Sequence, residues 1–179
     1  VTLKKICLDL PGYGNHDKDG LMELRNTAKS ADVFISNSKS NDDMYKSAFN
    51  YDGNIYHCGF PRNDELVGDA AKARDAVREK LSLQGKKIFL YAPTFRDRFE
   101  RTGIVDYSPF NVDFEKLHSA LENNLGGDWV ILVKFHPIMQ NAIDEDIYFT
   151  LPYVLNATSY NNMQELICGS DMLLTDYSS

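Results

Sequence analysis

Residues 130–137 read Val-Ile-Leu-Val-Lys-Phe-His-Pro, and this stretch decides the fold. Its first four residues are apolar without alternation, a pattern that is typical of a strand buried on both faces of a parallel sheet. Apolar runs at 88–92 and 172–175 predict two further strands, and helical patterns at 113–124 and 161–168 lie between the three strands. Strands that alternate with helices predict an α/β fold built on a parallel sheet.

The N-terminal half of the chain shows the same alternation of helices and strands. The elements expected there are helices at 19–31, 40–49 and 69–82 and short strands at 33–35 and 54–58. A polar break from Ser82 to Lys87 separates this half from the strand at 88–92. We therefore expect two Rossmann-like domains, with residues 1–83 in the first and residues 84–179 in the second.

The balance of charges limits the classes of function. The net charge is −7 with a pI of about 5.0, and the basic residues are scattered rather than gathered in a block. Because sequence-independent binding of nucleic acid needs a basic face, we expect no nucleic-acid partner. Cys7, Cys58 and Cys168 lie far apart without CxxC spacing, which predicts reduced, buried thiols rather than zinc ligands.

The two ends of the sequence do not read as natural termini. The chain begins with Val1 rather than Met and stops directly after a strand-like run. A parallel strand needs a crossover and a neighbour to cover it. We therefore expect the sequence to be an internal piece of a longer chain. No apolar run in it approaches the roughly 20 residues that span a bilayer.

Polar side chains follow all three strands of the second half. In an open parallel sheet, ligands bind at the carboxyl ends of the strands. The candidates for binding there are Thr94, Arg96, Lys134, His136, Asp176, Ser178 and Ser179. Hydroxyls, a guanidinium, an ammonium and an imidazole together match an anionic phosphate ligand, and a helix N-terminus at Ser178 would favour the same ligand.

Each candidate also has a purely structural interpretation. Thr94 and Arg96 fit a turn, Ser178 fits a helix cap, and Lys134 fits a solvated charge at a strand edge. His136 fits a strand cap equally well. The functional hypothesis depends on all of these groups lying at equivalent strand ends.

Other polar positions carry weaker signals. Arg62 and Asn63 follow Pro61, so they fit either a plain turn or side chains that face a ligand cleft. His57 lies within a strand and is expected to be packed, whereas His118 lies on a helix face and is expected to be solvated. The string Asn156-Ala157-Thr158 fits a glycosylation acceptor, which we interpret as chance.

Several strings in the two halves of the sequence together match the pattern of one enzyme family. In the second half these are YAPTFRD (91–97), KFHP (134–137) and TDYSS (175–179). In the first half they are LKKICLD (3–9), ISNSK (35–39) and GFPRNDEL (59–66). Together these strings resemble the CDP-glycerol glycerophosphotransferases of teichoic acid synthesis. The resemblance covers nearly the whole chain and implies a fold of two Rossmann-like domains of the glycosyltransferase-B type. This chain would cover the end of the first domain and the start of the second.

The resemblance also implies an activity, with His136 as a catalytic residue that donates to the leaving phosphate. Glycerol phosphate would pass from CDP-glycerol to a polyol-phosphate or glycan-lipid acceptor, and CMP would leave. The implied substrate-binding residues are Thr94, Arg96, Lys134, Ser178, Ser179, Asp176, Arg62 and Asn63. The catalytic base is expected outside this chain, so the piece alone should be inactive, and no metal or cofactor is implied.

The implied partners are a cytidine nucleotide donor and a lipid-linked polyol-phosphate acceptor. The implied location is the cytoplasm at the inner face of the cell membrane, with any membrane contact made by parts outside this chain. Three alternatives stay open: a ribitol-phosphate transferase, a nucleotide-sugar glycosyltransferase on the same fold, and a non-catalytic module that binds a partner.

Overall fold

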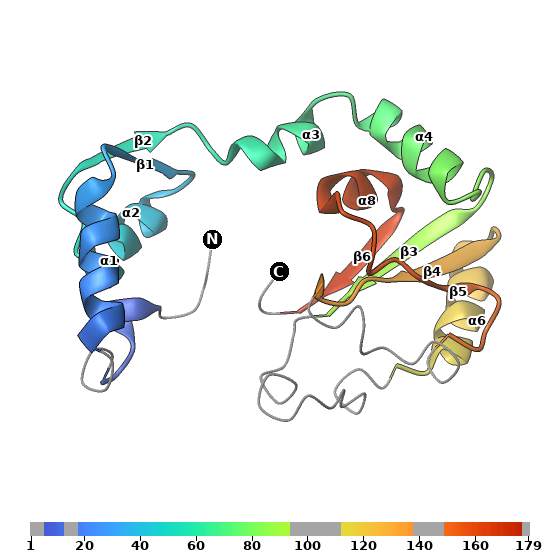
Figure 1. Cartoon of the computed structure of the whole chain (residues 1–179). Coiled ribbons are helices and arrows are strands. Elements are labelled where there is room, and N and C mark those ends of the chain that lie inside the picture. Colours follow the sequence, from blue (N-terminus) through green and yellow to red (C-terminus); the bar gives the residue numbers. More distant parts are fainter. Residues whose placement is uncertain (1–5, 13–17, 94–111, 138–148, 177–179) are drawn as a thin grey trace. The chain divides into compact units, whose positions relative to one another are not determined.

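The computed structural model describes residues 6–12, 18–93, 112–137 and 149–176 (Figure 1). Its contacts divide the chain into two compact units, Val1–Asp64 and Glu65–Ser179. Both units consist of parallel strands connected through helices. No helix within the described ranges is long and apolar enough to cross a bilayer.

The first unit is built on a two-stranded parallel sheet. Its elements are η1 (Cys7–Asp9), α1 (Lys18–Ser30), β1 (Val33–Ser36), α2 (Lys39–Ala48), β2 (Asn54–His57) and η2 (Pro61–Asn63). Ser36 lies opposite His57, so the two strands end at the same level. Phe34 on β1 stacks on the buried Tyr51, with ring centroids 4.0 Å apart. Because such a pair contributes about 0.5–1.5 kcal/mol beyond its burial, it holds the segment before β2 against the sheet.

Helix α2 starts immediately after the carboxyl end of β1 because Ser38 caps it. The Ser38 side chain accepts a hydrogen bond from the backbone N–H of Asn41 at 3.3 Å. A serine cap contributes about 1 kcal/mol. Asp42 in the first turn and Lys46 in the last turn complement the helix dipole.

The second unit carries a four-stranded parallel sheet. Its elements are α3 (Asp64–Val67, whose first residue still belongs to the first unit), α4 (Ala70–Lys80), β3 (Lys87–Ala92), α6 (Phe114–Leu125), β4 (Trp129–Val133), β5 (Val154–Asn156), α8 (Met163–Gly169) and β6 (Met172–Thr175). The strand order is β5-β4-β3-β6, so β3 and β4 lie in the middle. The connection from β5 to β6, which contains α8, therefore crosses both central strands.

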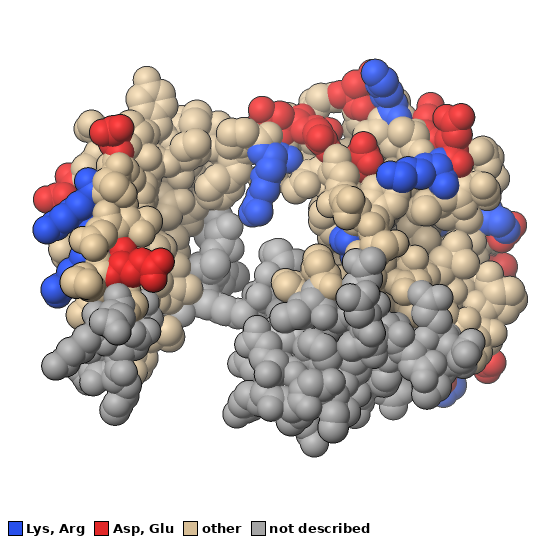
Figure 2. Space-filling view, viewed as in Figure 1, with Lys and Arg blue, Asp and Glu red and all other residues tan. Residues whose placement is uncertain are grey.

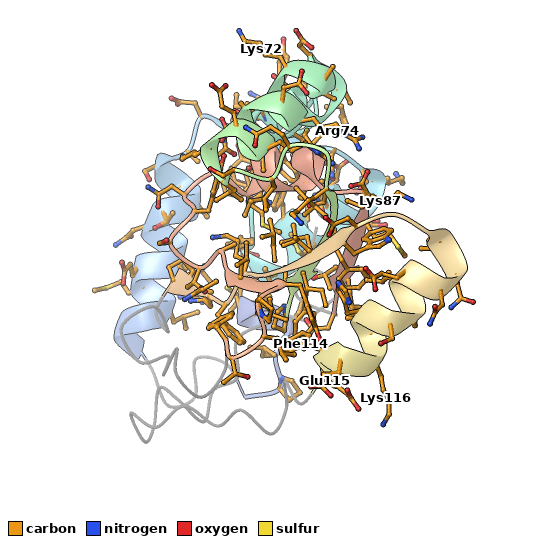
Figure 3. All side chains as sticks on the ribbon, turned by 90° about the vertical axis from the view of Figure 1, so that its right-hand side faces the viewer. Lys72, Arg74, Lys87, Phe114, Glu115 and Lys116 are labelled. Atoms are coloured by element: carbon orange, nitrogen blue, oxygen red, sulfur yellow. The ribbon has the colours of Figure 1, made fainter. Side chains whose placement is uncertain are left out.

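The two central strands bury both of their faces, which explains the unbroken apolar run at 130–133. Alternate residues such as Ile131 and Val133 pack with Phe114 and Leu121 of α6 on one face. The residues between them pack with α4 and α8 on the other face, in a cluster of Val77, Ile88, Leu90, Val130, Leu132 and Leu166. Figure 3 shows Arg74 on α4 and Phe114 on α6 on opposite sides of the sheet.

Helices α4 and α8 approach each other closely. A Cβ atom added at Gly169 would lie 2.7 Å from Cγ1 of Val77, so only glycine permits this approach. The Arg78 guanidinium donates to the Gly169 carbonyl at 2.7 Å and to Asp171 at 2.9 Å. Asp171 also accepts from Arg74 and from the backbone N–H of Ile88, so α4 is bonded to the amino edge of the sheet.

These contacts place α4 in the second unit. The compact units divide between Asp64 and Glu65, whereas the sequence-based boundary lies between residues 83 and 84. The polar break at 82–87 that marked the boundary in the sequence is the turn between α4 and β3. On the face shown in Figure 2, basic and acidic side chains are mixed over the described surface rather than separated.

Candidate functional site

The carboxyl ends of three strands of the second unit meet at one edge. Tyr91 of β3 lies opposite Val133 of β4, and Ala92 of β3 lies opposite Thr175 of β6. The Thr175 hydroxyl donates to the Ala92 carbonyl at 2.8 Å, which fixes the end of β6 to the end of β3. The described residues that directly follow these strands, Pro93, Lys134 and Asp176, therefore lie at one edge of the sheet, as the sequence pattern predicts.

Lys134, the first residue after β4, points its ammonium at backbone carbonyls. Its Nζ lies 2.6 Å from the Tyr160 oxygen, 3.1 Å from the Thr158 oxygen and 3.5 Å from the Ala157 oxygen. Burial lowers the pKa of this ammonium below its usual range. Because an ammonium has three donors, direct binding of a phosphate by Lys134 would compete with these contacts. Its expected role as a substrate-binding residue stays a prediction.

Phe135 anchors the same segment in the core. Its side chain is 1% exposed, and its backbone N–H donates to the buried Thr158 hydroxyl at 3.2 Å. The Thr158 N–H donates in turn to the Asn156 side chain at 2.9 Å. These bonds fix the residues after β4 to the residues after β5. No pattern in the sequence singles out Thr158, apart from the string Asn156-Ala157-Thr158 that we interpret as a chance glycosylation acceptor.

We call residues 134–137 and 156–160, joined by these bonds, the clamped loops. His136 comes directly after the buried Phe135 and is itself exposed. Asp176 follows β6 and is partly buried. The clamped loops therefore hold the backbone next to His136 rigidly while its side chain stays accessible to a ligand. This is the arrangement that a preorganised hydrogen-bond donor requires.

The remaining candidates divide into two groups. Thr94, Arg96, Ser178 and Ser179 lie outside the described residues. Arg62 and Asn63 form η2 at the end of the first unit, where the Asn63 N–H donates to the Phe60 carbonyl at 2.8 Å and the Arg62 guanidinium lies 5.8 Å from the centre of the Phe60 ring. A turn at this position is confirmed, and binding of substrate by the two residues stays a prediction.

The solvent exposure of two histidines is the opposite of that expected from the sequence. His57 is not packed: its side chain is 59% exposed, and its Nε2 lies 3.1 Å from a carboxylate oxygen of Asp42. His118 is not solvated: it is 13% exposed, bonds to the Trp129 carbonyl at 3.0 Å and stacks on Tyr153. His57 lies at the very end of a short strand, whereas His118 lies on the face of α6 that covers the sheet.

The thiols and carboxylates form no metal centre in the part of the chain that the structure describes. No three His, Cys, Asp or Glu side chains in those ranges lie close enough to hold a metal ion. Cys58 is exposed, contrary to the expected burial, while Cys7 and Cys168 are partly buried. Independence from metal stays a prediction.

Parallel strands with helices on both faces, and polar groups gathered at the carboxyl edge, define a Rossmann-like α/β protein of the ligand-binding kind. The sequence model of the family CDP-Glycerol:Poly(glycerophosphate) glycerophosphotransferase matches residues 1–179. The chain therefore belongs to that family, which confirms the resemblance found in the sequence.

Individual relatives agree with this assignment. The chain is 36% identical over 153 residues to the teichoic acid poly(glycerol phosphate) polymerase of Staphylococcus epidermidis, covering 83% of this chain and 20% of the relative. It is 32% identical to the polymerase of the same name from Bacillus spizizenii, covering 100% of this chain and 45% of the relative. The chain thus spans less than half the length of these relatives.

The fold also matches solved structures. The wall teichoic acid polymerase TagF superimposes with a TM-score of 0.74 at 29% identity, covering 99% of this chain and 43% of that chain. A TagF variant gives a TM-score of 0.77 at 31% identity, covering 100% and 44%. The expected fold class, two Rossmann-like domains of the glycosyltransferase-B type, is confirmed.

Proposed function

We propose that the intact protein transfers glycerol phosphate from CDP-glycerol to a hydroxyl of a polyol-phosphate or glycan-lipid acceptor in the synthesis of teichoic acid or a related cell-surface polymer. The observation that carries this proposal is His136, held accessible by the clamped loops at the carboxyl edge of the sheet, in a chain of this family. A TagF variant was soaked with CDPG, which supports a cytidine nucleotide as the donor.

The chemistry is a displacement at phosphorus. The acceptor oxygen forms a bond to the β-phosphorus of CDP-glycerol while the bond from that phosphorus to the bridging oxygen breaks, and CMP leaves with the electron pair. The hydroxyl proton passes to a base that we place outside this chain. Negative charge grows on the leaving phosphate, so a fixed donor there lowers the barrier, and His136 has that role.

Thr94, Arg96, Ser178 and Ser179 carry hydrogen-bond donors and would bind the diphosphate. They follow strands that end at the same edge, where Asp176 is a further substrate-binding candidate, and we assign the second unit, residues 65–179, to the nucleotide-binding domain. The first unit, with Arg62 and Asn63, would belong to the acceptor side. We place the intact protein in the cytoplasm at the inner face of the membrane, where a lipid-linked acceptor is accessible, with membrane contact through parts outside this chain.

Ribitol phosphate is the second candidate for the transferred group. The chain is 30% identical to the teichoic acid ribitol-phosphate polymerase TarL of Staphylococcus aureus, over 94% of its length. Glycerol and ribitol donors share the cytidine diphosphate, so the same strand-end groups would serve either of them.

The experiment that tests the proposal is release of CMP by the intact protein. We expect turnover with CDP-glycerol, less with CDP-ribitol and none with UDP-sugars, and calorimetry should give the same order of affinity. Tighter binding of a UDP-sugar would replace the proposal by a nucleotide-sugar glycosyltransferase. A preference for CDP-ribitol would select the second candidate, and binding without turnover of any donor would favour a non-catalytic module.

A further inference from the structure

A small hollow in the first unit is lined by the second half of α1 and the residues that follow α2. Its volume is about 220 Å³, and its lining residues are Arg25, Ala28, Lys29, Phe49 and Asn50. Because a cavity of about 10–15 Å³ already holds a water molecule, this hollow has room for a phosphate group. None of the site residues expected from the sequence lines it, so it is a separate place in the fold.

The two cations of the hollow are neighbours on α1. Arg25 and Lys29 are four residues apart, so their side chains lie on the same face of the helix, one turn from each other. Both are exposed, and neither forms an ion pair with an acidic side chain in the described ranges. Like charges at this spacing destabilise a helix, so the fold keeps this pair at a cost that a bound anion would relieve.

Helix stability explains only part of the hollow. Lys29 lies in the last turn of α1 and complements the helix dipole there, but Arg25 lies before that turn. Asn50 follows the end of α2 with a left-handed φ of 50°, a conformation for which glycine is the usual residue. Asparagine also accepts this backbone, and it adds an amide donor to the two cations.

We propose that this hollow binds a phosphodiester of the polyol-phosphate acceptor, at a phosphate away from the hydroxyl that reacts. The Arg25 guanidinium can donate to two phosphate oxygens at once, and the Lys29 ammonium supplies a second positive charge. The hollow belongs to the first unit, which we assign to the acceptor. This inference rests on the proposed function, because that function supplies a chain of phosphodiesters.

A membrane surface is the less suitable partner for the same two cations. Segments that bind anionic lipid surfaces carry clusters of about four to eight basic residues, whereas this hollow has two. A hollow also suits a single phosphate group better than a flat layer of headgroups. We therefore commit to the acceptor chain and make lipid binding an outcome of the test.

The test is calorimetry of the intact protein with a synthetic oligo(glycerol phosphate) and no donor present. We expect the double variant Arg25→Gln/Lys29→Gln to raise the Kd for the oligomer about tenfold, because two charged contacts are lost. Its stability should not fall, since glutamine is a good helix former and the like-charge pair is removed. The matched control is Lys39→Gln/Lys72→Gln, which changes the net charge equally at exposed positions outside the hollow and should leave the Kd unchanged.

A third variant tests the hollow without removing a cation. Asn50→Asp keeps a residue that accepts the left-handed backbone but places a negative charge beside the phosphate, so it should also raise the Kd for the oligomer about tenfold. The KM for CDP-glycerol should stay unchanged in all three variants, because the donor is assigned to the second unit.

Binding without donor distinguishes failure of this site from failure of the proposed function. If CDP-glycerol is not turned over but the double variant at Arg25 and Lys29 weakens oligomer binding, the site stands and the proposed function falls. The site is overturned if the wild type does not bind the oligomer, if the double variant leaves the Kd unchanged, or if the control weakens binding equally. Loss of binding to phosphatidylglycerol vesicles with an unchanged oligomer Kd would overturn it in favour of a lipid surface.

Discussion

The two parallel sheets end in edges of opposite character. At the edge of the second sheet, the Lys134 ammonium is directed at the backbone carbonyls of Ala157, Thr158 and Tyr160, and the Thr158 hydroxyl accepts from the buried N–H of Phe135. At the edge of the first sheet, the buried Oδ1 atoms of Asn41 and Asp42 accept no hydrogen bond from any residue that the structure describes. Both sheets are parallel, so the difference between the two edges comes from the side chains that follow the strands and not from the topology.

Among the substitutions that test the comparison of the two edges, the largest loss of turnover is expected at His136. Replacing His136 by Ala should reduce turnover of the intact protein by about 10²–10³, because a preorganised donor to the leaving phosphate is lost. Stability should change by only about 0.5 kcal/mol, since the side chain is exposed. Steady-state kinetics and thermal melting on the same preparation measure both quantities.

His118→Ala is the matched control, because His118 is packed against Tyr153 rather than exposed. It should lower the melting temperature and leave turnover per folded molecule near that of the wild type. Near-normal turnover of the His136→Ala protein, or a loss that only follows its stability, would contradict the catalytic role.

The next effect is expected at Lys134. Replacing it by Met keeps much of the chain length but removes the donors to three carbonyls, which should displace His136 and lower turnover by about tenfold or more, since small misplacements are costly. If Lys134 acts by positioning, the KM for CDP-glycerol should stay nearly constant while kcat falls. Lys116→Met, at a side chain 86% exposed, is the control and should change neither constant. A large rise in the KM for CDP-glycerol with unchanged kcat would instead assign Lys134 to direct substrate binding.

A smaller effect is expected at Thr158. Thr158→Val keeps the shape but leaves the Phe135 N–H buried without an acceptor, at a cost of about 1–3 kcal/mol in the free energy of unfolding. Thr158→Ser retains the hydroxyl and should restore most of that loss. Denaturant unfolding of the two variants measures the difference, and equal stability would show that the bond does not hold the clamped loops together.

Removal of divalent metal ions is expected to have no effect on turnover. Chelation with EDTA should leave turnover unchanged, because the proposed donors to the phosphate are side chains and not a metal ion. Activity lost with EDTA and restored by a divalent cation would contradict this view of the second edge and would require ligands outside the described residues.

Much of the fold could be predicted because its signals are local. The unbroken apolar run at 130–133 predicts a doubly buried strand, and β4 (Trp129–Val133) is buried at every position. β5 was missed because it has only three residues, too few for a periodic pattern. Its assignment needs the pairing with β4, which no local pattern contains.

The candidate site could be located from the sequence, but its internal bonds could not. Strand ends predict the place of Lys134 and His136 because parallel strands share an edge. The partners of Lys134 lie 23 to 26 residues further along the chain, so they depend on how β5 pairs. The errors at His57 and His118 have the same origin, because a helical or strand pattern does not identify which face another element covers.

The strand order has a consequence for how the second unit folds. Central strand β3 pairs with β6, and the bond between Thr175 and Ala92 joins residues 83 positions apart. Such long-range parallel pairing is entropically costly to form and slow. During synthesis, β3 and β4 therefore leave the ribosome before β6 is available, and one apolar edge stays open to other chains until β6 arrives. We expect pulse-labelling hydrogen exchange to show that the amides joining β3 and β6 become protected late in folding, after those joining β3 and β4.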